Sequence, residues 1–185
     1  RRTLVDLGRM LRRIHAIPQQ PVFEARLIPG DHTAADVRTR FGGLFDDAVA
    51  AVARAAQPWP FAVDPLQLAR LAMRALPDAD AWVALHSNPG LEHVFVDPQT
   101  GQLTGIIDFG DAYFSHPALD LPDGLGPSIG AAVHAGYCSE EKTSERFNQT
   151  WRVACVLTDM LAIAQDLECR AAGLVELEEL VEQLH

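Results

Sequence analysis

Residues 82–110 read WVALHSNPGLEHVFVDPQTGQLTGIIDFG, and this stretch holds the strand patterns of the chain. Short apolar runs at 82–85, 94–97 and 103–107 are separated by polar segments, and the turn-forming residues 98–101 connect the second run to the third. We therefore predict a small β-hairpin with the polar loop residues gathered at one end.

These polar residues follow the spacing of a phosphoryl-transfer site. In that template, a loop of the form H-x-D-x-x-x-x-N carries the base and one metal ligand, and a later D-F-G carries another ligand. Here the loop starts at His86, and Asn88 occupies the base position. His93 occupies the ligand position, and Asp108 opens an intact D-F-G. An amide cannot accept a hydroxyl proton as a carboxylate does, so the spacing indicates a phosphotransferase scaffold with a degenerate base.

The rest of the chain has helical periodicity. Apolar residues recur every three or four positions in six segments, which we predict to be helices: 3–16, 33–56, 66–76, 128–137, 144–167 and 174–184. Gly42 and Gly43 mark a point where the second helix is expected to bend. With no internal repeat, the simplest prediction is a single domain over residues 1–185, mainly α with a small β-hairpin (α+β).

Composition limits the partners and the location. The net charge is −10 without a basic stripe, which argues against nucleic acid and suits a cationic small molecule, although many proteins are acidic for solubility alone. No apolar run approaches the roughly 20 residues that span a bilayer, and no signal-peptide pattern is present. We expect a cytoplasmic protein without a membrane partner. Cys138, Cys155 and Cys169 lack C-x-x-C spacing and are predicted to be reduced thiols.

The position of the one lysine bears on nucleotide binding. A kinase grips the phosphates of ATP with a strand lysine and a Gly-rich loop, and both precede the catalytic loop. Lys142 follows that loop, and residues 1–85 contain no lysine, no G-x-G-x-x-G and no G-x-x-x-x-G-K. We therefore expect this chain to lack the β-rich lobe that would hold ATP.

Four segments resemble the motifs of one enzyme family. Residues 85–97 are similar to H-G-D-L-x-P-x-N or H-G-D-L-G-P-E-H, 104–112 to V-I-D-F-G-D-A, 116–121 to G-D-P-A-x-D-L-A, and 7–18 to L-x-x-L-H-x-I-P. These are motifs of the aminoglycoside phosphotransferase family. The resemblance implies the C-terminal helical lobe of a protein-kinase-like fold, without the β-rich N-terminal lobe that family members carry ahead of the opening helix.

The resemblance also implies a metal and cofactor site. Asp108 matches the family's magnesium-binding aspartate, and a carboxylate is the hard oxygen ligand that Mg²⁺ prefers. His93 stands where many members have asparagine and others have histidine. An imidazole is a poorer Mg²⁺ ligand than an oxygen donor, so His93 is expected at the metal, at a phosphate, or as a loop cap. Mg²⁺ and ATP are the implied cofactors, with weak binding expected for this chain alone.

Other matched positions surround the loop. Asn88 replaces the catalytic aspartate, His86 and Asp120 match residues that brace the loop, and Asp111 is expected near the substrate pocket. The family's Gly-Asp-Leu is Ser87-Asn88-Pro89 here, and several such departures together indicate drift from catalysis or adaptation to another use. The remaining histidines form no spaced cluster and are assigned no site: His15, His32, His134 and His185.

Three functional hypotheses follow. The chain is the C-terminal lobe of an ATP-dependent small-molecule O-phosphotransferase, severely impaired as an isolated chain because of Asn88 and the missing lobe. Alternatively, it is a non-catalytic pseudokinase that binds a small hydroxylated or cationic ligand near Asp108 and Asp111. In the third hypothesis it is an interaction module, and a homodimer or a partner protein covers an apolar face where the missing lobe would pack. Of the two outcomes for the isolated chain under the first hypothesis, inactive or severely impaired, we expect the inactive one.

Overall fold

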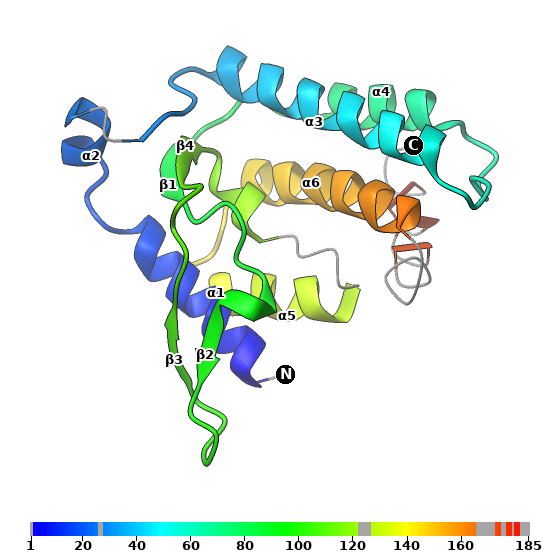
Figure 1. Ribbon diagram of the computed structural model, residues 1–185. Coiled ribbons are helices and arrows are strands. Elements are labelled where there is room, and N and C mark those ends of the chain that lie inside the picture. The colour runs from blue at the N-terminus through cyan, green and yellow to red at the C-terminus, as the bar shows by residue number, and fades with distance from the viewer. Residues whose placement is uncertain are drawn as a thin grey trace.

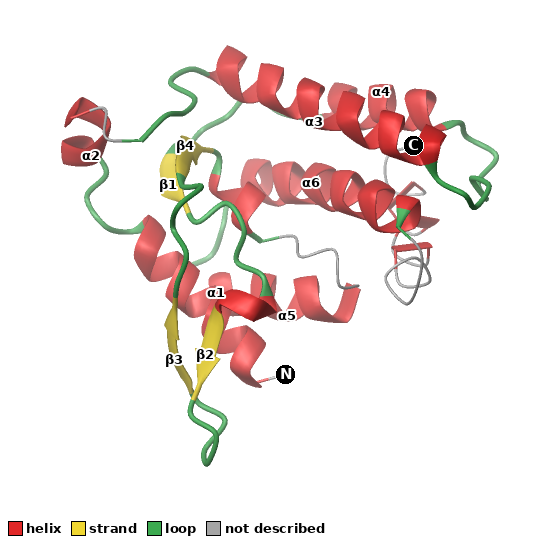
Figure 2. Cartoon of the chain, viewed as in Figure 1, coloured by secondary structure: helices red, strands yellow, loops and turns green. Residues whose placement is uncertain are grey.

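The computed structural model describes residues 2–25, 28–121, 127–165, 173–174, 177–178 and 180–181, and the chain folds into a helical assembly with two short antiparallel sheets (Figures 1 and 2). This confirms the predicted mainly α architecture with a small β-hairpin. The helices of the described ranges are α1 (Arg2–His15), α2 (Gln20–Ala25), α3 (Ala34–Arg54), α4 (Pro65–Ala75), α5 (Pro127–Tyr137), α6 (Glu145–Ala164) and the 3₁₀ helices η1 (Leu91–His93) and η2 (Pro117–Asp120). The helix predicted over 174–184 lies largely outside the described residues.

Local sequence explains where the long helices begin. Thr33 accepts a hydrogen bond from the Asp36 amide, and the Asp36 carboxylate accepts one from the Thr33 amide, which makes a capping box ahead of α3. Asp64 caps α4, with Pro65 in the first turn, and Ser144 caps α6. α3 continues as one helix through Gly42 and Gly43, the point where a bend was expected.

The described residues form two sheets of two strands each, whereas the sequence predicted that all the strands form one small hairpin. Strands β2 (Val94–Val96) and β3 (Leu103–Ile106) form the predicted hairpin. The run expected at 82–85 becomes β1 (Val83–Leu85), which pairs instead with β4 (Tyr113–Ser115) in a sheet of its own. β4 has three residues, too few to show an alternating pattern, and the sequence therefore did not reveal it.

The core consists of two hydrophobic clusters. The larger cluster joins α3, α4 and α6, and Leu177 and Leu180 contribute to it. The smaller cluster joins α1 and α5 to the end of η2 and receives one face of the hairpin. Trp151 packs against both clusters, and η2 sends Leu119 toward the larger one and Ala118 into the smaller one. The two clusters therefore meet beside η2.

Helices α1 and α5 approach closely because glycines line their contact (Figure 1). A Cβ atom added at Gly8 would lie 1.9 Å from the carbonyl oxygen of Val133, and one added at Gly136 would lie 2.0 Å from that of Val5. Real Cβ contacts are never this short, so any larger residue would force the helices apart. This crossing fixes how the C-terminal ends of α1 and α5 face η2.

Candidate active site

A loop follows β1, and the carboxylate of Asp120 holds its first residues. Asp120 is fully buried at the end of η2. Its Oδ2 accepts the backbone N–H of His86 at 2.7 Å, and its Oδ1 accepts that of Ser87 at 2.8 Å. Two charge-assisted hydrogen bonds from successive amides fix the direction in which the loop leaves the strand.

Asp120 is itself held by two side chains for which the sequence predicted no site. His15, at the end of α1, places Nε2 2.9 Å from Asp120 Oδ2 and Nδ1 3.0 Å from the hydroxyl of Tyr137. All three residues are buried. The signal that could have identified His15 was its place in the L-x-x-L-H-x-I-P motif. Tyr137 comes from the end of α5, so the glycine-lined helix crossing delivers both supports to the loop.

The ring of His86 braces the loop against the D-F-G segment rather than against Asp120. Its Nε2 lies 2.7 Å from the carbonyl oxygen of Ile107, and its ring packs edge-on against Phe109 with centroids 4.5 Å apart. Only the backbone amide of His86 reaches Asp120. Within the described residues, Nδ1 of this buried ring has no hydrogen-bond partner. His86 therefore ties the start of the loop to the strand end that carries Asp108.

Two residues of this region adopt left-handed backbone conformations. Ser87 has φ of 78° and Asp108 has φ of 69°, and they are the non-glycine residues with positive φ in the described chain. Such a conformation costs a residue with a side chain roughly 1–2 kcal/mol. Backbone strain of this kind concentrates at functional sites, where the surrounding structure enforces it.

His93 connects the loop to Asp108. Its Nδ1 lies 2.8 Å from the carbonyl oxygen of Asn88, so the hydrogen-bond network assigns the proton to Nδ1 in the neutral ring. The free lone pair on Nε2 then lies 3.6 Å from Oδ2 of Asp108. A histidine fixed through one nitrogen to a carbonyl is a common arrangement for a ring whose other nitrogen contacts a cation.

The residues fit a magnesium ion bound mainly through its phosphate ligands and water. Asp108 offers an exposed carboxylate, with 63% of its side chain accessible, and His93 offers Nε2 beside it. Across the described ranges, no group of three or more His, Cys, Asp or Glu side chains is arranged to hold a metal ion. Mg²⁺ commonly uses one or two carboxylates and retains water or substrate phosphate in its other positions, which matches this sparse donor set.

The remaining predicted residues are exposed. Asn88 is exposed on the loop, and Asp111 follows the D-F-G segment. No hydrogen bond or ion pair links Asp111 to another residue that the structure describes. The structure thus brings His86, Asn88, His93 and Asp108 into one connected group anchored on Asp120, and it leaves Asp111 at the edge.

A partly buried ion pair supports the second strand of the β1–β4 sheet. Arg40 donates from Nε and Nη2 to the carboxylate of Asp31 at 2.7 and 2.9 Å, and Ser115 donates its hydroxyl to the same carboxylate. The hydrogen bond to Asp31 raises the pKa of Arg40. The Arg40 guanidinium also lies over the ring of Tyr113, whose burial raises its pKa to about 12. This group joins α3 to β4 and was not foreseen, because its members are far apart in the sequence.

His116 occupies the position where the family motif has aspartate. It caps η2, with Nδ1 accepting the amide of Ala118 at 3.2 Å, and its Nε2 lies 3.3 Å from Oδ1 of Asp80. Burial lowers the pKa of His116, and the Asp80 carboxylate opposes part of that shift. The neutral ring can satisfy both contacts, so His116 serves the geometry of η2 and hence of Asp120.

The hairpin turns an apolar face outward beside His93. Val94 and Ile106 pair across the strands and pack on the smaller core cluster, which leaves Phe95 on the other face. Leu91, Phe95, Val96, Ile107 and Phe109 are all 44% to 52% exposed. Apolar side chains gathered in this way on a surface commonly mark an interaction site.

Comparison with known proteins relates the chain to phosphotransferases. The model of the phosphotransferase enzyme family, APH, matches residues 1–154. No curated protein sequence is significantly similar to the chain. Among the helices that the structure describes, none has the length and apolar character needed to cross a membrane.

Three solved structures have similar folds. A macrolide 2'-phosphotransferase of type I aligns with a TM-score of 0.61 and 20% identity over 95% of this chain and 58% of its own. An aminoglycoside-3'-phosphotransferase of type VIII aligns with a TM-score of 0.54 and 20% identity over 86% and 60%. The apoenzyme of a macrolide 2'-phosphotransferase from Brachybacterium faecium gives 0.51 and 19% over 95% and 59%. The chain therefore shares their kinase-like fold and spans less than two thirds of their length.

Proposed function

The chain belongs to the phosphotransferase enzyme family, and from this premise we propose that it forms the helical lobe of a small-molecule O-phosphotransferase site whose chemical step is severely impaired. The proposed reaction class is transfer of the terminal phosphoryl group of ATP to a hydroxyl group. The observation that carries the proposal is the connected group of Asp120, the loop and Asp108, with Asn88 at the base position. Because the reaction would require ATP, the proposed location is the cytoplasm.

Each loop residue has a proposed part in positioning. Asp120 and His86 hold the loop and the D-F-G segment in register through the contacts described above. Asn88 would hydrogen-bond the acceptor hydroxyl and orient it, since an amide oxygen is a competent acceptor. Asp111 and Asp108 place exposed negative charge after β3, near the loop, which favours a hydroxylated substrate that also carries amines.

Mg²⁺ would be held by the carboxylate of Asp108, with Nε2 of His93 at its side, and would supply charge neutralisation of the ATP phosphates. Nδ1 of His93 donates a hydrogen bond to the carbonyl oxygen of Asn88. The orientation of the His93 ring toward Asp108 therefore does not depend on the ion.

The replacement of the base by Asn88 is expected to slow the proposed reaction, but other contributions to its rate remain. General-base assistance is worth roughly 10²–10⁴-fold, whereas phosphoryl transfer depends mainly on positioning and charge neutralisation. Lys142 is the one lysine in these 185 residues and follows the loop. The groups that grip ATP ahead of the loop in kinases are thus not found in this sequence, and tight nucleotide binding by these residues alone is not expected.

Calorimetric titration with ATP tests the proposal. We expect weak binding that requires Mg²⁺ and disappears in Asp108→Ala, while Asn88→Asp retains the binding. Asp46→Ala, which removes an exposed carboxylate from α3, is the matched control and should bind as the parent does. Absence of binding at millimolar ATP, or equal binding by Asp108→Ala, would sink the enzymatic proposal for this chain.

The outward apolar face favours a second candidate function, that of a non-catalytic binding or interaction module. Phe95 and Ile107 lie on the hairpin face that carries His93, where a second lobe, a partner protein or another copy of the chain would cover them. Sedimentation of the parent and of Phe95→Ser tests this alternative. A concentration-dependent dimer that the substitution abolishes supports self-association, and a monomer at all concentrations contradicts it.

A further inference from the structure

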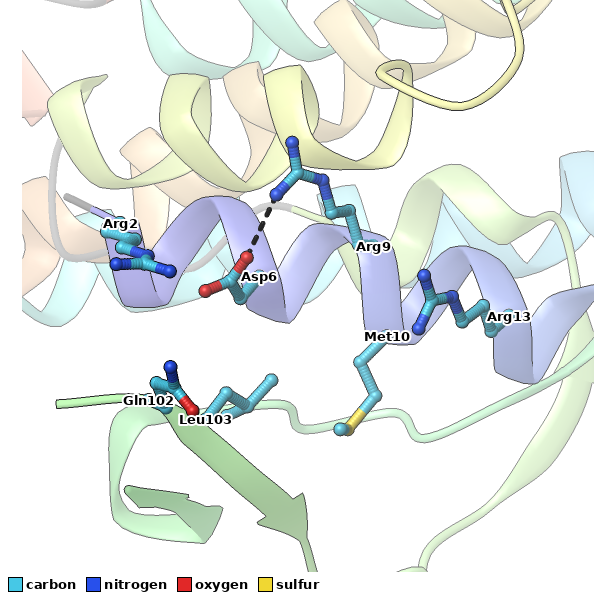
Figure 3. A pocket seen from close by; sticks show the side chains of 7 residues that line it. All are labelled: Arg2, Asp6, Arg9, Met10, Arg13, Gln102 and Leu103. Atoms are coloured by element: carbon cyan, nitrogen blue, oxygen red, sulfur yellow. Dashed lines mark hydrogen bonds and ion pairs between the residues drawn. The ribbon is translucent and has the colours of Figure 1, made fainter. Parts of the chain in front are cut away.

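A cavity lies away from the candidate active site, between α1 and the start of β3 (Figure 3). Its volume is about 310 Å³, at the small end of the range of ligand pockets. The lining residues come from one stripe of α1 and from the end of the hairpin turn: Arg2, Asp6, Arg9, Met10, Arg13, Gln102 and Leu103. None of them belongs to the group around Asp120 and Asp108.

The hairpin wall of this cavity is fixed to the helix. Thr3 donates its hydroxyl to the carbonyl oxygen of Gly101 at 3.1 Å, and Leu103 packs on the smaller core cluster. These contacts therefore set the space between Met10 on α1 and Leu103 on β3. Met10 and Leu103 lie between Arg2 and Arg13 and give the cavity an apolar part (Figure 3).

The charges around the cavity are unequal. Arg9 points away from Gln102 and Leu103 in Figure 3, and its guanidinium donates to Asp6 at 3.0 Å and to Ser139 at 3.1 Å. This pairing neutralises Asp6, the acidic residue among the lining side chains. Among the lining residues this leaves the positive charges of Arg2 and Arg13, in a chain whose overall charge is −10.

The two remaining guanidinium groups are available to a ligand. Arg2 has no hydrogen bond or ion pair with any residue that the structure describes. Arg13 donates from Nη2 to Glu140 at 2.7 Å, and both side chains of that pair are well exposed. Ion pairs at such sites contribute little and exchange readily, and a guanidinium has further N–H groups to donate.

The spacing of the two arginines defines the ligand. Arg2 and Arg13 stand at opposite ends of the cavity in Figure 3 and are eleven residues apart on one helix, which corresponds to about 16 Å along its axis. The two positive charges therefore originate far apart along the helix, as the two acidic groups of one elongated molecule would require. We propose that this cavity binds an elongated small molecule with an acidic group at each end and an apolar middle that rests on Met10 and Leu103.

Titration with dicarboxylates of different length tests this proposal by calorimetry. Sebacate, with ten carbons, is expected to bind more tightly than malonate, which is too short to reach both arginines, and more tightly than decanoate, which has one acidic end. Arg2→Gln and Arg13→Gln should each weaken sebacate binding about two- to fivefold, since exposed ion pairs have this strength. The double variant should lose the preference for length.

Arg70→Gln provides the matched control, because it removes an exposed arginine from α4, outside the cavity. It should bind sebacate as the parent does. Equal affinity for malonate and sebacate, or an equal loss of affinity in Arg70→Gln, would overturn the proposal and leave only non-specific attraction of anions. Neither outcome depends on ATP binding, so this test is independent of the proposed phosphotransferase function.

Discussion

At the scale of single residues, the loop after β1 is held by a few polar atoms with defined partners. Asp120 accepts hydrogen bonds from two loop amides. His15 contacts the same carboxylate through Nε2, and Tyr137 contacts the other ring nitrogen of His15. Buried polar groups are costly to leave unpaired, so each of these contacts has a measurable consequence.

Substitution of the anchor is the most direct test. Asp120→Ala should lower the free energy of unfolding by about 3 kcal/mol or more, because it leaves the amides of His86 and Ser87 and the ring of His15 without an acceptor. Denaturant titration measures the loss, and hydrogen exchange of the two amides should accelerate. Asp46→Ala is the control and should change stability by no more than about 0.5 kcal/mol.

The left-handed backbone conformation of Ser87 leads us to predict that glycine at this position would stabilise the protein. Its φ of 78° suits glycine, the residue that the family motif has at this position, so Ser87→Gly should raise the free energy of unfolding by about 0.5–1 kcal/mol. Ser87→Ala keeps the steric conflict and should give no gain. Equal stability of the two variants would contradict the conformational explanation.

The buried ring of His116 predicts a pH dependence. Burial keeps the pKa of His116 below its usual value of about 6.5, so the unfolded chain binds the proton more readily than the folded chain. Stability is therefore full above that pH and falls as the pH is lowered through it toward the depressed folded value. His116→Asn keeps an acceptor for the Ala118 amide and removes the titration, so the parent should lose more stability than the variant between pH 7 and 5. Parallel losses in denaturant titrations would contradict this assignment.

At the scale of elements, the crossing of α1 and α5 sets the geometry of the site, because its glycines bring the ends of both helices to η2. Gly8→Ala and Gly136→Ala should each destabilise the protein by about 1–3 kcal/mol, since the added methyl group meets backbone atoms. Gly43→Ala is the matched control. A Cβ there meets nothing within 4 Å in the interior of α3, so this variant should gain about 0.5–1 kcal/mol. Thermal unfolding measures these changes: the unfolding temperature should fall in Gly8→Ala and Gly136→Ala and rise in Gly43→Ala.

The elements also show where sequence reasoning succeeded and where it did not. Long periodic helices such as α3 and α6 were predicted because many residues report the same pattern. The short helix α2 was missed, since it spans six residues and contains Pro21, although proline is tolerated in the first turn. β4 was missed because pairing with β1 over a long sequence separation leaves no local signal.

The same distinction applies to the site. Loop spacing and the D-F-G motif pointed to His86, Asn88, His93 and Asp108, which are local in the sequence and which the structure places in one connected group. The supports from Tyr137 and from the Asp31–Arg40 pair became visible only in three dimensions, because each joins segments that are far apart.

At the scale of the whole molecule, two core clusters meet beside η2, and Trp151 packs against both. We predicted one domain over residues 1–185, and this shared packing suggests that the clusters unfold together. Urea unfolding followed by tryptophan fluorescence and by far-ultraviolet circular dichroism should give one coincident transition. Separate transitions would show that the clusters are independent folding units.

The partnership of α1 with α5 has a consequence for biosynthesis. α1 ends at His15 and α5 begins at Pro127, so the ribosome adds more than a hundred residues before the partner of α1 exists. At translation rates of about 5–20 residues per second, this interval lasts roughly 5–20 seconds. During it, the apolar side of α1, including Leu7 and Leu11, has no native surface to cover it. The nascent chain is therefore expected to engage chaperones through α1, and His15 can support Asp120 only after that helix is released.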